Sequence, residues 1–309
     1  MGGNVLTGSL KNLLRNRNAI LTLALLAGLF WGKGARWTEP VTLPALAIVM
    51  TLSTLGLPGS VFRSFRNLLA PAMIGIAMNY LVLGIALLAL NAVLIHDEAL
   101  RMGFILIAAV PPGVAIIPFT YFLKGDETLS LIGTAGAYLG ALIIMPVGAL
   151  VFLGPGFVDV TKLTVIMLEL ILCPVIVSRL LLRIGVASRL DSIRGTITNW
   201  SFFLLTYTIV GLNRDLILGD PLSFLPVVII ALASTFLLGW GIEKAGALLH
   251  LPQKVLTSLV LLGTLKNYGL AGGLALALFS KKTSVPATVS AVFMIIYIIW
   301  LELKLRRSG

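Results

Sequence analysis

Residues 261–270 read Leu-Leu-Gly-Thr-Leu-Lys-Asn-Tyr-Gly-Leu, which places Lys266 in the middle of an apolar run. The run covers residues 255–279, and at about 1.5 Å per residue it can cross a bilayer core of about 30 Å. A lone ammonium at that depth costs several kcal/mol unless a partner or a wet cavity receives it. Asn267 and Gly269 can interrupt a helix, and irregular backbone at this depth occurs only inside protein or around a cavity. The stretch therefore predicts a functional site, with a helix shifted so that Lys266 reaches the membrane surface as the alternative.

The composition of the whole chain excludes a soluble domain. Of its 309 residues 58% are hydrophobic and 11% are charged, whereas globular proteins carry about 25% charged residues. The net charge of +11 is spread between apolar runs and does not form one patch, so the bilayer is the expected partner and nucleic acid is not. The two histidines form no metal-ligand cluster, and the chain has no phosphate-binding loop. We expect an all-α polytopic membrane protein that is not an enzyme and holds no cofactor or metal.

The order of apolar runs predicts a basic lead-in over residues 1–17 and ten transmembrane spans. Lys and Arg favour the connections on the side of the termini by roughly two to one, which predicts a cell-membrane protein with both termini in the cytoplasm. The expected spans cover residues 18–34, 41–60, 68–95, 102–122, 128–153, 161–184, 197–217, 222–248, 255–279 and 284–303.

Two of these spans are interrupted near their middle. The fourth contains Pro111, Pro112 and Gly113, and a proline removes a helix hydrogen bond and obstructs the preceding turn. The ninth contains residues 267–269 (Asn-Tyr-Gly). Each is the fourth span of a five-span half, so the chain is expected to consist of two inverted repeats, residues 1–156 and 157–309. Matching broken spans in inverted halves predict a midplane binding site in a secondary transporter.

Few polar groups lie inside the spans. Lys266 adjoins the carbonyl-rich end of a broken helix, where three roles stay open: a fixed structural cation, a proton carrier or a substrate contact. Glu169 can pair with Lys266, line a substrate path or point to the headgroups. Asn79 of the third span is a site candidate or an interhelical hydrogen-bonding group. Ser130 and Thr134 lie four residues apart, so they share one helix face and either line the crossing or bond back to the preceding turn.

The residues of the fourth, fifth and ninth spans resemble the bile acid:sodium symporter family. Residues 111–126 (PPGVAIIPFTYFLKGD) are similar to that family's Pro-Gly-Gly-Thr-Ala-Ser-Asn segment with the following Thr-Tyr-Leu-Ala-x-Gly-Asp. Ser130 and Thr134 match the next motif, and residues 267–271 resemble the Gln-Asn-Ser-Gly-Leu-Ala segment of the ninth span. The resemblance implies a panel domain (spans one, two, six and seven), a core domain with two crossing broken helices (spans three to five and eight to ten), and organic-anion substrates.

The departures from the family pattern concern its two sodium sites. Ile116 and Ile117 stand where the resemblance places the Ser-Asn pair of the first site, and Leu262 stands at its glutamate. Lys266 stands at a glutamine of the second site, with Asn79 at its other glutamine. An ammonium there would exclude sodium by charge, so the resemblance implies that both sites are lost.

The sequence therefore predicts a sodium-independent secondary transporter or facilitator of a small organic anion. Lys266 would replace the sodium ion, while residues 111–113, Asn267 and Gly269 would shape the crossing. A proton-coupled carrier that uses Lys266 and Glu169, and a non-transporting membrane receptor of the same fold, are the alternatives.

Overall fold

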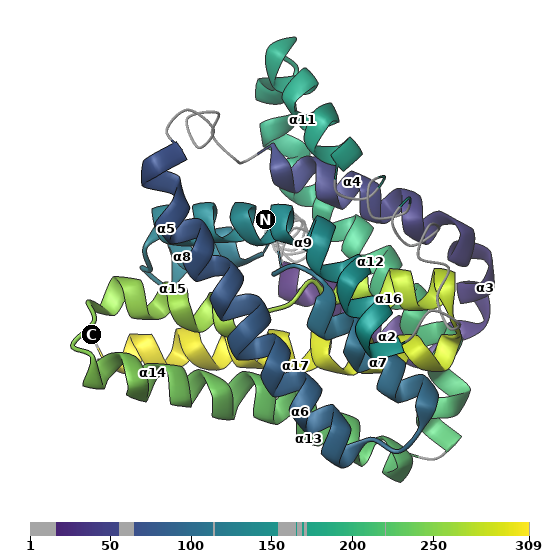
Figure 1. Cartoon of the computed structure of the whole chain (residues 1–309). Coiled ribbons are helices and arrows are strands. Elements are labelled where there is room, and N and C mark those ends of the chain that lie inside the picture. The colour runs from purple at the N-terminus through teal and green to yellow at the C-terminus, as the bar shows by residue number, and fades with distance from the viewer. Residues whose placement is uncertain are drawn as a thin grey trace, which may run out of the picture. The chain divides into compact units, whose positions relative to one another are not determined.

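The computed structural model describes residues 17–55, 65–113, 115–153, 165, 169, 172–219 and 221–308, and these residues are almost entirely helical (Figure 1). The lead-in expected over residues 1–17 and the first half of the expected sixth span lie almost wholly outside them. The chain divides into two compact units. One contains the helices before residue 56 and those between residues 168 and 219, and the other contains the remaining helices.

The first unit is a set of helices that pack through small residues. A Cβ on Gly28 would lie 2.7 Å from Val210, and one on Gly32 would lie 2.8 Å from the carbonyl oxygen of Gly211. This close approach brings the Tyr207 hydroxyl within 3.0 Å of the Trp31 carbonyl, to which it donates a hydrogen bond. The elements are α2 (Arg17–Phe30), η1 (Gly32–Gly34), α3 (Ala35–Thr38), η2 (Glu39–Val41), α4 (Thr42–Thr54), α11 (Cys173–Arg183) and α12 (Ala187–Gly219). Helix α12 begins ten residues before the expected seventh span.

The second unit contains two long helices that each include a π-helical turn, and two further spans that are each broken into two short helices. The long composite helices are α5 (Phe65–Ile76) with η4 (Ala77–Gly84) and α6 (Ile85–Leu94), and α13 (Leu225–Leu232) with η7 (Ala233–Leu237) and α14 (Leu238–Leu248). The broken spans are α7 (Glu98–Ala109) with α8 (Ile116–Phe122), and α15 (Gln253–Thr264) with α16 (Tyr268–Leu278). Helices α9 (Glu127–Leu153) and α17 (Lys281–Ser308), with the short η6 (Pro221–Phe224), complete the unit, and α14 lies beside α15 (Figure 1).

Four helices of the described residues are long and apolar enough to cross a membrane: Leu68–Leu94, Glu127–Phe152, Leu222–Leu248 and Lys281–Leu305. A fifth span results if the pair Ala19–Phe30 and Gly32–Leu52, bent by 91°, counts as one. The protein is thus a polytopic membrane protein. The expected fourth and ninth spans fall short of a full span because each is divided at its middle, as the prolines and Asn267 indicated.

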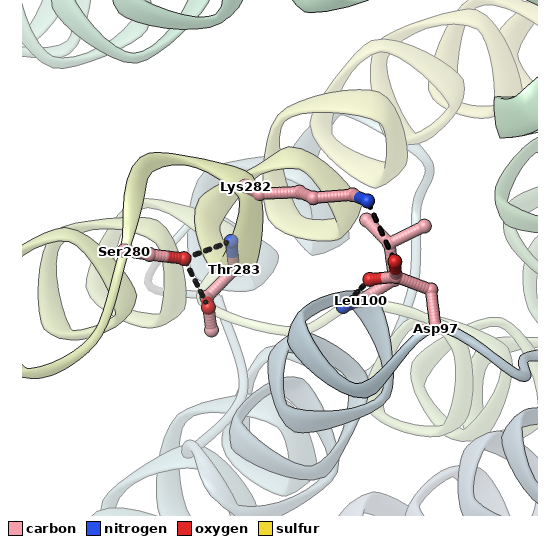
Figure 2. A network of polar contacts seen from close by, with 5 residues as sticks. All are labelled: Asp97, Leu100, Ser280, Lys282 and Thr283. Carbon is pink, nitrogen blue, oxygen red and sulfur yellow. Dashed lines mark hydrogen bonds and ion pairs between the residues drawn. The ribbon is translucent and has the colours of Figure 1, made fainter.

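The starts of the broken spans are tied to neighbouring helices. Asp97 caps α7 by accepting a hydrogen bond from the N–H of Leu100 at 3.1 Å. Its other carboxylate oxygen lies 2.6 Å from the ammonium of Lys282 in the first turn of α17, next to the cap made by Ser280 (Figure 2). On the other broken span, Ser258 of α15 donates to the carbonyl of Asp126 and accepts from its N–H. These bonds fix the N-terminal parts of both broken spans to neighbouring segments.

Gly75 and Gly133 allow α5 and α9 to pack backbone against backbone. A Cβ on Gly75 would lie 2.2 Å from the carbonyl oxygen of Gly133. We expect Gly75→Ala to destabilise the protein by about 1–3 kcal/mol, because the two helices must separate. Gly241→Ala is the matched control, since its Cβ would meet nothing within 4 Å and should leave stability unchanged or raise it by up to ~1 kcal/mol. Thermal unfolding in detergent measures both, and equal melting temperatures for the two variants would contradict the packing.

The ion pair of Asp97 predicts a pH-dependent contribution to stability. Partial burial acts to raise the pKa of Asp97, but the hydrogen bonds from Lys282 and Leu100 outweigh it and hold the pKa below its usual value. The stabilisation is therefore present above about pH 4 and is lost as the pH falls through the lowered pKa. Asp97→Asn keeps the cap and loses the ion pair, so we expect it to be about 0.5–1 kcal/mol less stable at pH 7. In melting curves from pH 7 to 3, the difference from the wild type should become smaller toward the acidic end, and a constant difference would refute this account.

Candidate functional site

The break between α7 and α8 follows from its two prolines. Helix α7 ends at Ala109, and Val110 is extended. A continuing helix would use the N–H of residue 112 to bond the carbonyl of Ala108, but Pro112 has no N–H. The carbonyls of Ala108 and Val110 at the end of α7 are therefore available to another donor.

The break between α15 and α16 covers residues 265–267, two residues earlier than the sequence indicated. Leu265 is extended, and Asn267 caps α16 by accepting a hydrogen bond from the N–H of Leu270 at 3.0 Å. The expectation that Tyr268 and Gly269 interrupt the helix is wrong, because the side chain of Asn267 starts a new helix whose first turn contains both residues.

The two breaks meet in a short antiparallel bridge between Pro112 and Lys266. The N–H of Asn267 donates to the carbonyl of Pro111 at 3.0 Å, and the N–H of Gly113 donates to that of Leu265 at 3.4 Å. Gly113 favours this approach, since a Cβ there would lie 3.0 Å from the carbonyl oxygen of Lys266, a tight contact. The bridge satisfies backbone groups that two broken helices would otherwise leave unpaired inside the membrane.

The side chain of Lys266 folds back to the end of α7. Its Nζ donates to Asn79 Oδ1 at 2.7 Å, to the carbonyl of Ala108 at 2.8 Å and to the carbonyl of Val110 at 2.9 Å. The ring of Tyr80 lies below it, with its centroid 4.5 Å from Nζ. Lys266 is 1% exposed. The carbonyl end of a helix attracts a cation, and here the cation is covalently attached to the chain.

This geometry suits the protonated form of Lys266. An ammonium has three N–H groups and a neutral amine has two, while three oxygens accept from this nitrogen. Within the described residues no carboxylate forms an ion pair with Lys266. The charge is thus held by neutral oxygens and an aromatic face.

A π-helical turn presents both Asn79 and Tyr80 to the ammonium. The turn, η4, interrupts the helix that runs from α5 to α6, and such turns are frequent at functional sites. The Tyr80 hydroxyl donates to the carbonyl of Ala137 in α9 at 2.9 Å, which fixes the ring. Asn79 Nδ2 has no partner within the described residues.

Ser130 and Thr134 lie on one face of α9, as their spacing predicted. Thr120 of α8 donates to the Ser130 hydroxyl at 2.7 Å, whereas the Thr134 hydroxyl has no partner within the described residues. One turn further along α9, the Tyr138 hydroxyl accepts a hydrogen bond from Asn267 Nδ2 at 3.0 Å. Tyr138 was missed from the sequence, although its spacing from Thr134 indicated the same face.

The place that the resemblance assigned to a first sodium site contains apolar side chains. Ile116 and Leu262 are both fully buried. They offer no side-chain oxygen, and sodium requires several. Within the described residues there is also no group of three His, Cys, Asp or Glu side chains that could hold a metal ion.

Glu169 belongs to a different unit from the other predicted site residues. It is exposed and belongs to the unit that contains α11 and α12, whereas Lys266 belongs to the other unit. The structure thus brings together Lys266, Asn79, Asn267 and the segment 111–113, with Tyr80 and Tyr138 as additions. Sequence reasoning missed Tyr80 and the two backbone carbonyls because a carbonyl carries no side-chain signal.

Comparison with known proteins agrees with the resemblance in the motifs. The Sodium Bile acid symporter family matches residues 43–219, which is more than half of the chain. The chain is also 24% identical over 266 residues to the "Uncharacterized sodium-dependent transporter YocS" of Bacillus subtilis (strain 168), covering 83% of this chain and 80% of that protein. With its two broken helices bridged at Pro112 and Lys266, the chain belongs to the sodium bile acid symporter family of membrane transporters.

Proposed function

We propose that the protein is a secondary transporter of a small organic anion that works without sodium, with the ammonium of Lys266 in place of the ion. The observation that carries the proposal is the binding of Lys266 Nζ by Asn79 Oδ1 and by the carbonyls of Ala108 and Val110. All three ammonium hydrogens are used, so the structural-cation role is favoured over direct contact with a substrate. YocS bears the name of a sodium-dependent transporter. The lysine of this chain, at a position where the family resemblance places a glutamine, supports a different coupling here.

Further features support the inverted repeats 1–156 and 157–309. In this arrangement α5–α6 corresponds to α13–α14, and both contain a π-helical turn. The broken spans α7–α8 and α15–α16 then correspond, and an antiparallel bridge joins their breaks. We assign the unit with α2, α4, α11 and α12 as the panel and the other unit as the core, within ten spans and with both termini cytoplasmic. Alternating access would result from movement of the core against the panel.

Transport assays in sodium-free proteoliposomes test the proposal. We expect uptake of labelled organic monoanions, with pyruvate, 2-oxoisovalerate and taurocholate as probes, at the same rate whether the external cation is sodium or potassium. Uptake driven by a pH gradient would instead indicate the proton-coupled carrier, and no flux of any probe would favour a receptor.

Lys266→Gln should make transport sodium-dependent. The substitution removes the attached cation and leaves neutral oxygens from Asn79, Ala108, Val110 and the new side chain, a set that suits a sodium ion. We expect sodium to stimulate uptake by the variant severalfold and to leave the wild type unchanged. A wild type that responds to sodium, with a variant indistinguishable from it, would refute the replacement.

A double-mutant cycle tests whether Lys266 and Asn79 form one unit. Asn79→Leu leaves a buried ammonium without one acceptor and should cost about 1.5–3 kcal/mol. Lys266→Met removes the donor for two buried carbonyls and should also destabilise the protein. The double variant no longer buries a charge. Its loss of unfolding free energy, measured by chemical unfolding, should therefore be about 1–3 kcal/mol smaller than the sum of the losses of the two single variants. Asn79→Asp, which retains an acceptor, is the matched control, and strictly additive losses would show that the two side chains act independently.

A further inference from the structure

The cation site of this protein is permanently occupied. Lys266 Nζ is attached to the chain and lies within 2.9 Å of three oxygens, and the residue is 1% exposed. A diffusible ion would leave such a site when its concentration is low. The ammonium cannot leave, so every state of the transport cycle contains the bound cation.

Permanent occupancy changes what an empty carrier can do. In a symporter, the carrier that holds the ion without the substrate must not reorient, because such a step would let the ion leak down its gradient. The carrier escapes from that state by releasing the ion. A carrier whose ion is covalently attached remains in that state whenever the substrate is absent.

The charges around Lys266 also disfavour reorientation of the carrier without substrate. Three carboxylates of the core are already engaged near the ends of helices: Asp97 pairs with Lys282, Glu243 pairs with Lys304, and Asp126 caps α9. Within the described residues none of them pairs with Lys266. In the substrate-free core the ammonium of Lys266 therefore contacts only neutral acceptors and an aromatic ring among the described residues, and a bound monoanion would neutralise its charge.

We propose that the protein exchanges one organic monoanion for another and performs little net transport. This inference rests on the proposed function, since it requires that the protein carries organic anions with Lys266 as its cation. The anion-loaded core reorients in both directions. The substrate-free core does not, because its charge is unpaired and its cation cannot dissociate.

The experiment compares labelled uptake into two kinds of sodium-free proteoliposomes, one empty and one preloaded with the same unlabelled anion. Pyruvate, 2-oxoisovalerate and taurocholate are the probes. We expect uptake into preloaded vesicles to be at least about tenfold faster, which corresponds to a penalty of about 1.4 kcal/mol on reorientation of the empty core. Exchange of equal charges should also be insensitive to a potassium diffusion potential. A return step that moves one charge across the whole field would instead change up to about 50-fold per 100 mV.

Lys266→Gln provides the matched comparison. In the presence of sodium its ion can dissociate, so we expect net uptake into empty vesicles and a smaller effect of preloading. Equal wild-type rates in empty and preloaded vesicles would overturn the exchange mechanism and leave the proposed function intact. Absence of flux for all probes in both preparations would overturn the proposed function itself. If the variant does not fold, the wild-type comparison and its response to voltage still decide between exchange and net transport.

Discussion

Three hydrogen bonds from the ammonium of Lys266 connect parts of the core that are distant in the sequence. The acceptors belong to η4 and to the end of α7, while the lysine belongs to the break after α15. Without this donor, the carbonyls of Ala108 and Val110 would remain unpaired in a region that excludes water. The cation thus holds the two broken helices together at the depth where each has lost its own hydrogen bonds.

This arrangement accounts for how a family of sodium symporters can include a chain with a lysine at its centre. Under the proposed function, the ammonium of Lys266 stands in place of a bound sodium ion, and it complements the negative end of α7. The two cations differ in that an ion dissociates and an ammonium does not. On the proposed function, this chain would therefore lack the ability to draw energy from a sodium gradient.

The polar groups around the crossing divide into two classes. Asn267 and Gly113 shape the backbone, the first by capping α16 and the second by allowing the close approach of Lys266. Asn79 and Tyr80 hold the charge, and the π-helical turn brings both to the same side. The fully buried Ile116 and Leu262 stand at positions that the resemblance assigns to the first sodium site, so these positions offer apolar side chains.

The sequence by itself determined the membrane class, the two broken spans and the presence of a charge, Lys266, within one of them, because hydropathy, prolines and a charge inside an apolar run are local signals. Only the tertiary structure decided what Lys266 binds. Two of its three acceptors are backbone carbonyls, and every residue has one, so no pattern of side chains identifies them. The exact start of α16 likewise depended on whether Asn267 accepts a hydrogen bond from Leu270 or breaks the helix with Gly269, and both are compatible with the same sequence. Long-range packing selects between them because it fixes the chain on both sides of the break.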